Sequence, residues 1–356
     1  MQSRRLPSGR PTLRPWVSEN PEMTALAERL FQGVLLRLKE ARAQRALFEK
    51  GWSDYLATTP WSFSLESASE TSHSLLGVEK SPVPDKLGLH FSIWLQQLRS
   101  SLDNALHACV GANQGTATPS KSNFIEFPIF ESQRKFKDSK TIKNADLEEG
   151  LIDVLRGFQP FMLTRFKSCS PPWLSEPVED AQLSPLYWLN ELARKDRHRM
   201  MHVGVGSIIV PRNIRLIGGA EHTITYRHPE DAIFAGSTCL MRFETTSPLR
   251  YRKLKFRQKM ELLPDIAGWM NAQSLVYSAS AYSEEVGHAT IRVSLKQRMK
   301  NVESLVEEIC RRLGSMANLP PEFLAMSDFA DYSRRYNSRD HINSTETQRQ
   351  RRINGL

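Results

Sequence analysis

Apolar residues recur at intervals of three and four through residues 87–109, which read LGLHFSIWLQQLRSSLDNALHAC. Positions with this spacing fall on one face of an α-helix, so the pattern predicts an amphipathic helix of about six turns. Beside the apolar face, Arg99, Asp103 and His107 follow one another at intervals of four and are expected to stack as a polar ladder. A helix with so apolar a face needs a second layer of structure to cover it.

Further helices are indicated by the same periodicity and by residues typical of helix ends. Four are predicted, over residues 21–50, 148–156, 185–201 and 300–313. The first is expected to end at Gly51, because glycine is common just beyond helix ends. Ser184 followed by Pro185 predicts the start of the third, with the serine as a capping residue and the proline at the first helical position.

Alternation of apolar and polar residues predicts strands in two parts of the chain. Residues 61–67 and 74–79 can pair with each other, and FIEFPIF (124–130) reads as a short strand whose Pro128 suits an edge. From residue 203 to about 295 the chain is β-rich and broken by glycine and proline. The predicted fold class is α+β, with a helical N-terminal part carrying long amphipathic helices and a β-rich C-terminal part closed by a helix.

The formal net charge of +9 is concentrated at the two ends of the sequence. Residues 1–20 carry four arginines against one glutamate, and residues 333–356 carry six arginines against two acidic residues, so these ends hold +7 of the total. Basic segments can bind nucleic acid or an acidic partner by counterion release, although a solvated, unstructured end is the commoner meaning. The expected organisation is a disordered basic tail (1–20), a helical part (21–201), a β-rich part (202–315) and a basic C-terminal tail (316–356).

The cysteines and the hydropathy pattern indicate a cytoplasmic protein. The four cysteines lie far apart without a CxxC pair, and three of them have apolar neighbours, which is typical of reduced core residues. The first residues lack the apolar run of a secretory signal, and no window approaches 18 uncharged apolar residues, so no membrane partner is expected.

Asp196 falls in the middle of the apolar face of the helix predicted at residues 185–201. An acidic side chain in that position is costly unless it is paired. Arg199, three residues later, is one partner within reach. Arg99 of the long helix is the tertiary candidate, and we expect Arg99 and Asp196 to meet where the two helices pack.

The sequence carries no motif that fixes a reaction. There is no GxSxG element, no phosphate-binding glycine-rich loop and no pair of cysteines to ligate a metal. His198 and His202 have the spacing of two metal ligands, but the glutamate of zinc proteases is missing between them, and a solvated polar face is the default interpretation. No cofactor or metal is expected.

Four short motifs carry a family resemblance. They are LQQLRSSLDNAL (95–106), FPIF (127–130), FQPF (158–161) and DRHR (196–199). In their order and spacing the chain resembles a widespread, uncharacterised family of bacterial proteins of similar length, whose members read close to LHNLRSALDHL, FPIF, LQPY and DKHR. The resemblance spans roughly residues 20–315.

The first of these motifs is also similar to the Arg-x4-His signature of HEPN ribonucleases, in which an arginine and a histidine from paired helices act on RNA. Arg99 matches the arginine, but Asn104 occupies the position of the histidine and cannot act as a general acid or base near neutral pH. Together, the polar ladder of the long helix and the polar residues at the end of the helix predicted at residues 185–201 give the candidate site residues, which are Arg99, Asp103, His107, Asp196, His198 and Arg199.

The resemblance implies a cytoplasmic, HEPN-like module that is non-catalytic or degenerate and binds RNA or a protein partner. One alternative is a metal-independent ribonuclease in which Arg99 works with His107 or His198. Such an enzyme needs two copies of the long helix facing each other, which would make the protein a homodimer. Another alternative is a small-molecule sensor whose β-rich half holds the ligand.

Overall fold

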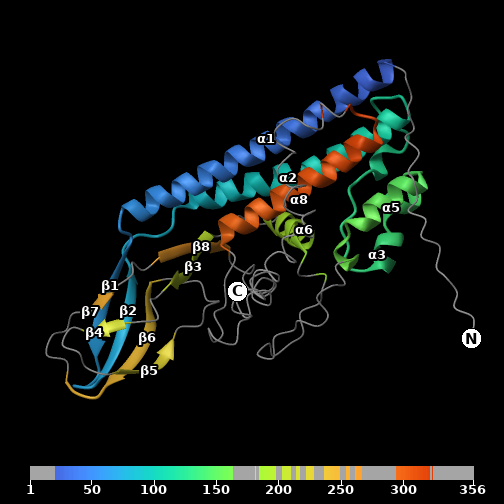
Figure 1. Ribbon diagram of the computed structural model, residues 1–356. Coiled ribbons are helices and arrows are strands. Elements are labelled where there is room, and N and C mark those ends of the chain that lie inside the picture. The colour runs from blue at the N-terminus through green and yellow to red at the C-terminus, as the bar shows by residue number, and fades with distance from the viewer. Residues whose placement is uncertain are drawn as a thin grey trace, which may run out of the picture.

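Three long helices lie side by side and form the centre of the molecule (Figure 1). They are α1 (Pro21–Ala57), α2 (Asp85–Asn113) and α8 (Leu295–Met316). The computed structural model describes residues 21–162, 181, 184–197, 203–209, 214–216, 222–227, 236–248, 254–256, 261–266, 294–320 and 323. The fold is α+β, with a helical N-terminal part and a helix after the strands, as the sequence predicts.

The apolar face predicted for residues 87–109 is buried against α1 and α8. Phe91, Trp94 and Leu95 in α2 have no exposed surface, and the ring of Phe91 lies 6.3 Å from that of Phe48 in α1. Gly51 does not end α1, as the sequence suggested, but lies within it. A Cβ at that position would come 2.8 Å from Leu87, so the glycine allows α2 to approach α1 closely.

Buried ion pairs join α1 to α8. Arg45 in α1 donates from Nε to both carboxylate oxygens of Glu303 at 2.9 Å, and Trp94 in α2 donates to the same carboxylate at 2.8 Å. One turn away in each helix, Arg42 donates to Glu307. Because each carboxylate is buried beside a matching guanidinium, these pairs fix how α8 lies on the other two helices.

A four-stranded antiparallel sheet lies at the end of the helical layer where α1 ends and α2 begins (Figure 1). Its order is β1 (Trp61–Ser67), β2 (Ser72–Glu79), β6 (Ser237–Thr245) and β5 (His222–Arg227). The predicted pairing of the first two strands is confirmed, with Leu65 opposite Leu75. Because β2 pairs with β6, the sheet crosses the domain boundary expected at residue 202.

The remaining described strands form two antiparallel pairs. β3 (Val203–Ile209) pairs with β8 (Glu261–Ile266), and β4 (Ile214–Leu216) pairs with β7 (Leu254–Phe256). The buried Arg298 of α8 donates to Asp265 of β8 at 2.5 Å, which ties the first of these pairs to the helical layer. Within the described residues, no helix is both long enough and apolar enough to cross a membrane.

Short elements follow α2 and surround the candidate site. They are η1 (Ser122–Phe124), α3 (Gln133–Lys137), α4 (Lys140–Asn144), α5 (Glu149–Gly157), η2 (Pro160–Met162) and α6 (Pro185–Asp196). α6 begins at the predicted Pro185, although Ser184 makes no capping hydrogen bond with its side chain. The strand predicted at residues 124–130 is wrong, because Ile125 to Phe130 form no ladder with another strand.

Candidate functional site

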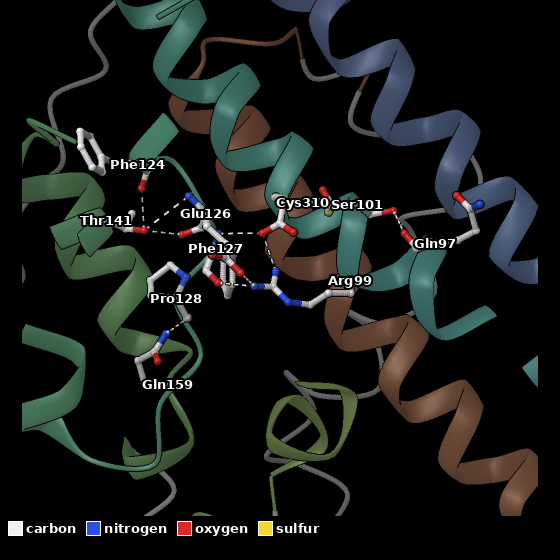
Figure 2. A network of polar contacts seen from close by, with 11 residues as sticks. Gln97, Arg99, Ser101, Phe124, Glu126, Phe127, Pro128, Thr141, Gln159 and Cys310 are labelled. Atoms are coloured by element: carbon white, nitrogen blue, oxygen red, sulfur yellow. Dashed lines mark hydrogen bonds and ion pairs between the residues drawn. The ribbon is translucent and has the colours of Figure 1, made fainter. Parts of the chain in front are cut away.

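Arg99 lies at the centre of a polar network between α2 and the segment that follows it (Figure 2). Its side chain is only 9% exposed. Nη1 donates to Oδ1 of Asp103 at 2.5 Å, while Nη2 donates to Oε1 of Glu126 at 2.9 Å and to the carbonyl oxygen of Phe127 at 3.0 Å. The guanidinium is therefore held by two carboxylates and one backbone carbonyl, all from the same chain.

Asp103 binds the same residue as Arg99, Phe127, but through its backbone N–H instead of its carbonyl oxygen. Its Oδ1 accepts the backbone N–H of Phe127 at 2.9 Å as well as the bond from Arg99. Burial raises the pKa of the Asp103 carboxyl, and the nearby charge of Glu126 adds to this rise, while Arg99 and the Phe127 amide oppose it. One turn of α2 thus satisfies both the N–H and the C=O of residue 127, as a neighbouring strand would do in a sheet.

Gln159 holds the next part of the segment from the other side. It is 1% exposed and belongs to the FQPF motif between α5 and η2. Its amide nitrogen donates to the carbonyl oxygens of Pro128 at 2.8 Å and Leu155 at 3.0 Å, and its amide oxygen accepts the N–H of Phe130 at 3.0 Å. The FPIF and FQPF motifs therefore meet through one buried amide group.

Thr141 of α4 completes the hydrogen bonding of the segment at its beginning. Its hydroxyl lies 2.7 Å from the carbonyl oxygen of Glu126 and 3.0 Å from that of Phe124, and the N–H of Glu126 approaches it at 3.4 Å (Figure 2). Side chains thus take the place of a partner strand for residues 124–130. This is the physical reason why an extended segment with a strand-like sequence stays outside the sheets.

Asp196 does not meet Arg99, so the predicted pairing of these two residues is wrong. Asp196 is half-buried at the end of α6 and is bound by two other side chains of α2. The hydroxyl of Ser92 donates to Oδ1 of Asp196, and the amide of Gln96 donates to its Oδ2 at 3.1 Å. Gln96 also donates to the carbonyl oxygen of Ala193 at 3.3 Å. The two helices do pack together, but neutral donors one to two turns before Arg99 make the contact.

His107, the candidate histidine among the described residues, does not pair with Arg99. His107 is half-buried two turns after Arg99, and within the described part of the chain it makes no hydrogen bond or ion pair. His198 and Arg199 lie outside the described residues. Asn104 lies beside Asp103 in α2, and the nitrogen of its side-chain amide cannot serve as a proton acceptor.

The charged groups of the network neutralise one another, because the guanidinium of Arg99 pairs with the carboxylates of Asp103 and Glu126. Glu126 is 69% exposed and Asp103 is 33% exposed, so the carboxylate side of the network faces solvent while Arg99 lies beneath it. An anion approaching this surface meets negative charge first. Among the residues described above, no three His, Cys, Asp or Glu side chains gather in a way that could hold a metal ion.

Sequence reasoning found Arg99, Asp103 and Asp196 but missed the side chains that bind them and the side chains that bind residues 124–130. The missed residues are Ser92, Gln96, Glu126, Thr141 and Gln159. Of these, Gln96 and Gln159 carried a signal, because each lies within a motif of the family resemblance. All four motifs contain residues that bind one another or α2.

The chain was compared with protein-family models, with curated proteins and with solved structures, and none of the three comparisons finds a match.

Proposed function

We propose that this protein is a non-catalytic, HEPN-like module that works by binding RNA. The observation that carries the proposal is the state of Arg99, the residue that matches the arginine of the HEPN signature. Its guanidinium is engaged by Asp103, Glu126 and Phe127 and is almost fully covered. An arginine used in this way contributes to folding, and three of its five N–H donors are already engaged by groups of its own chain.

Among the residues that the structure describes, no histidine lies within hydrogen-bond reach of Arg99, which supports the same proposal. A metal-independent ribonuclease needs a general acid or base with a pKa near the working pH, placed within hydrogen-bond reach of the reacting groups. Asn104 cannot serve, and His107 makes no hydrogen bond to the Arg99 network within the described residues. Two copies of α2 would also have to face each other, yet Arg99 is already covered by the segment that carries Glu126 and Phe127.

The charge distribution supports RNA as the ligand. Residues 1–20 and 333–356 together carry ten arginines and +7 of the net charge of +9. Arginine binds phosphate oxygens with two parallel donors, and each phosphate that it neutralises releases counterions. Binding of this kind is largely independent of base sequence and falls steeply as salt concentration rises.

The proposal is tested by measuring cleavage and binding of RNA separately. Full-length protein is incubated in EDTA with total RNA, beside Arg99→Lys, His107→Ala and His198→Ala variants. We expect no cleavage by any of them. Cleavage by the unmodified protein that disappears in the Arg99→Lys variant would contradict the proposal and establish the ribonuclease alternative.

Binding is measured by fluorescence anisotropy with a labelled single-stranded RNA over a range of salt concentrations. We expect the logarithm of the association constant to fall linearly with the logarithm of salt concentration, by about 0.7 for each neutralised phosphate. Replacing the ten terminal arginines by glutamine should remove most of this slope. A matched variant with ten exposed lysines and arginines of the described residues replaced should retain it. Absence of binding at low salt would overturn the proposal and favour a protein partner.

A further inference from the structure

The outer face of α1 carries two exposed leucines in an otherwise well-covered helical layer. α1 lies along one edge of that layer, with α2 and α8 on its inner side (Figure 1). On the opposite side, Leu36 is 67% exposed and Leu47 is 45% exposed. They are eleven residues apart, so they lie on nearly the same line along the helix. Ala43, also exposed, falls between them on this line.

The exposed line follows the spacing of a coiled-coil seam. Among the exposed residues from Arg29 to Asp54, one row has alternating intervals of four and three, the spacing of positions that face a partner helix when a second helix packs alongside. The members of this α1 stripe, all exposed, are Arg29, Gly33, Leu36, Glu40, Ala43, Leu47, Lys50 and Asp54. The side that packs on α2 and α8 has its own buried residues, so the stripe is a second, separate face.

The stripe is complementary to itself when a second copy runs in the opposite direction. In that arrangement Leu36 of one copy meets Leu47 of the other, and this contact occurs twice because of the two-fold symmetry. Glu40 then lies opposite the small Ala43, which leaves room for its side chain. We propose that the α1 stripe pairs two copies of this chain as an antiparallel coiled coil.

The charges at the ends of the stripe select the antiparallel direction. Arg29 is exposed near the beginning of the stripe and has no ion-pair partner within the described residues. Asp54 at its other end is 63% exposed, and among the described residues its ion-pair partner is Lys50 of its own helix. Antiparallel packing brings Arg29 of one copy to Asp54 of the other. Parallel packing would place Arg29 beside Arg29 and Asp54 beside Asp54, which like charges disfavour.

The contact differs from the dimer that a HEPN-type ribonuclease requires. It uses the outer face of α1 and leaves α2 covered, so it does not bring two copies of Arg99 together. It is also independent of RNA binding, because no residue of the stripe belongs to residues 1–20 or 333–356.

The proposal is tested first by sedimentation velocity of the full-length protein over a wide range of concentration. We expect a reversible dimer. Leu36→Glu and Leu47→Glu should each weaken it by at least about tenfold, because the new charge would be buried against a leucine. Leu89→Glu is the matched control, since Leu89 is 50% exposed on α2 and outside the stripe, and it should leave the dimer unchanged. A protein that stays monomeric, or a dimer indifferent to the α1 substitutions, would overturn the proposal.

The direction of packing has its own test. Arg29→Glu and Asp54→Arg should each weaken the dimer, and the variant with both changes should regain it. Separately, a Leu36→Cys protein is mixed with a Leu47→Cys protein of distinguishable mass and oxidised. Antiparallel packing predicts the mixed disulfide, because only facing Cα atoms come within about 4.4–6.8 Å. Disulfides only within each variant would indicate parallel packing and would contradict the proposed arrangement.

Discussion

The Asp103 carboxylate accepts the backbone N–H of Phe127 at 2.9 Å, while its neighbour in the same helix face, Arg99, donates to the carbonyl oxygen of that same residue. A single turn of α2 therefore binds both backbone polar groups of one residue, Phe127, in a segment that has no partner strand among the described residues. Arg99, which matches the arginine of the nuclease signature, and Asp103 act here together as a backbone clamp.

Replacing Arg99 by alanine should destabilise the fold by about 2–3 kcal/mol. The substitution leaves Asp103 without its cation and the Phe127 carbonyl without this donor. The loss is smaller than for a fully buried pair because Asp103 and Glu126 are partly exposed. Urea denaturation followed by circular dichroism measures the free energy of unfolding. Glu126→Gln, at the exposed end of the network, is the control and should cost about 0.5 kcal/mol or less.

A Gln159→Ala variant should lose about 2–3 kcal/mol of stability. The amide of Gln159 is buried and makes three hydrogen bonds, and its removal leaves the N–H of Phe130 and the carbonyl oxygen of Pro128 without these partners. Hydrogen exchange should show faster exchange at the Phe130 amide. Gln133→Ala, at an exposed position of α3, should change neither quantity. If the Phe130 amide keeps its protection in Gln159→Ala, the clamp is not what holds this segment.

The pH dependence of stability should reveal the raised pKa of Asp103. Because burial makes the folded state bind this proton more tightly, the contribution of Asp103 is largest below the unfolded pKa of about 3.9 and is lost as the pH rises through the folded value. The free energy of unfolding is compared between the unmodified protein and Asp103→Asn from about pH 3.5 to pH 7. As pH rises, the unmodified protein should lose stability relative to the Asp103→Asn variant. A shift in the opposite direction would mean that Arg99 outweighs burial.

The thiols of Cys109 and Cys310 should resist modification in the folded protein. Burial raises the pKa of Cys109 to about 12 and raises the pKa of Cys310 as well, so neither forms the reactive thiolate near neutral pH. With Cys169 replaced by serine, Ellman's reagent should modify only the half-buried Cys239 under native conditions. All three should react in guanidinium chloride. Rapid native modification of Cys109 would contradict the packing of α2 against its neighbours.

The periodicity of apolar residues was sufficient to predict the helices and strands that bury one apolar face. The spacing of Leu87, Phe91, Trp94 and Leu98 predicted α2, because a regular stripe has only one regular structure that buries it. The alternation at residues 61–67 and 74–79 predicted β1 and β2 for the same kind of reason. The same reasoning failed at Gly51, since a glycine can end a helix or admit a close neighbour, and only the position of Leu87 decides between them.

The partners of the site residues could not be read from local spacing. Arg99 meets Glu126, which lies 27 residues later in a segment whose sequence resembles a strand. Whether such a segment joins a sheet depends on what satisfies its backbone, and here Thr141 and Gln159 do so from two other elements. Asp196 does contact α2, as expected, but not through Arg99. A half-buried carboxylate can be satisfied by neutral donors as well as by a cation, and here Ser92 and Gln96 are the donors.

Because α8 comes late in the sequence, α1 and α2 are synthesised long before the helix that covers them. Trp94 donates to Glu303, 209 residues later, and β2 pairs with β6 across a similar separation. Such contacts have a high loop-closure cost and form late. A nascent chain that has not yet reached residue 295 exposes the faces of α1 and α2 that α8 covers, including the arginines that await Glu303 and Glu307. The helical layer therefore closes only after α8 has been synthesised, and until then the apolar surface that α8 covers is exposed to aggregation.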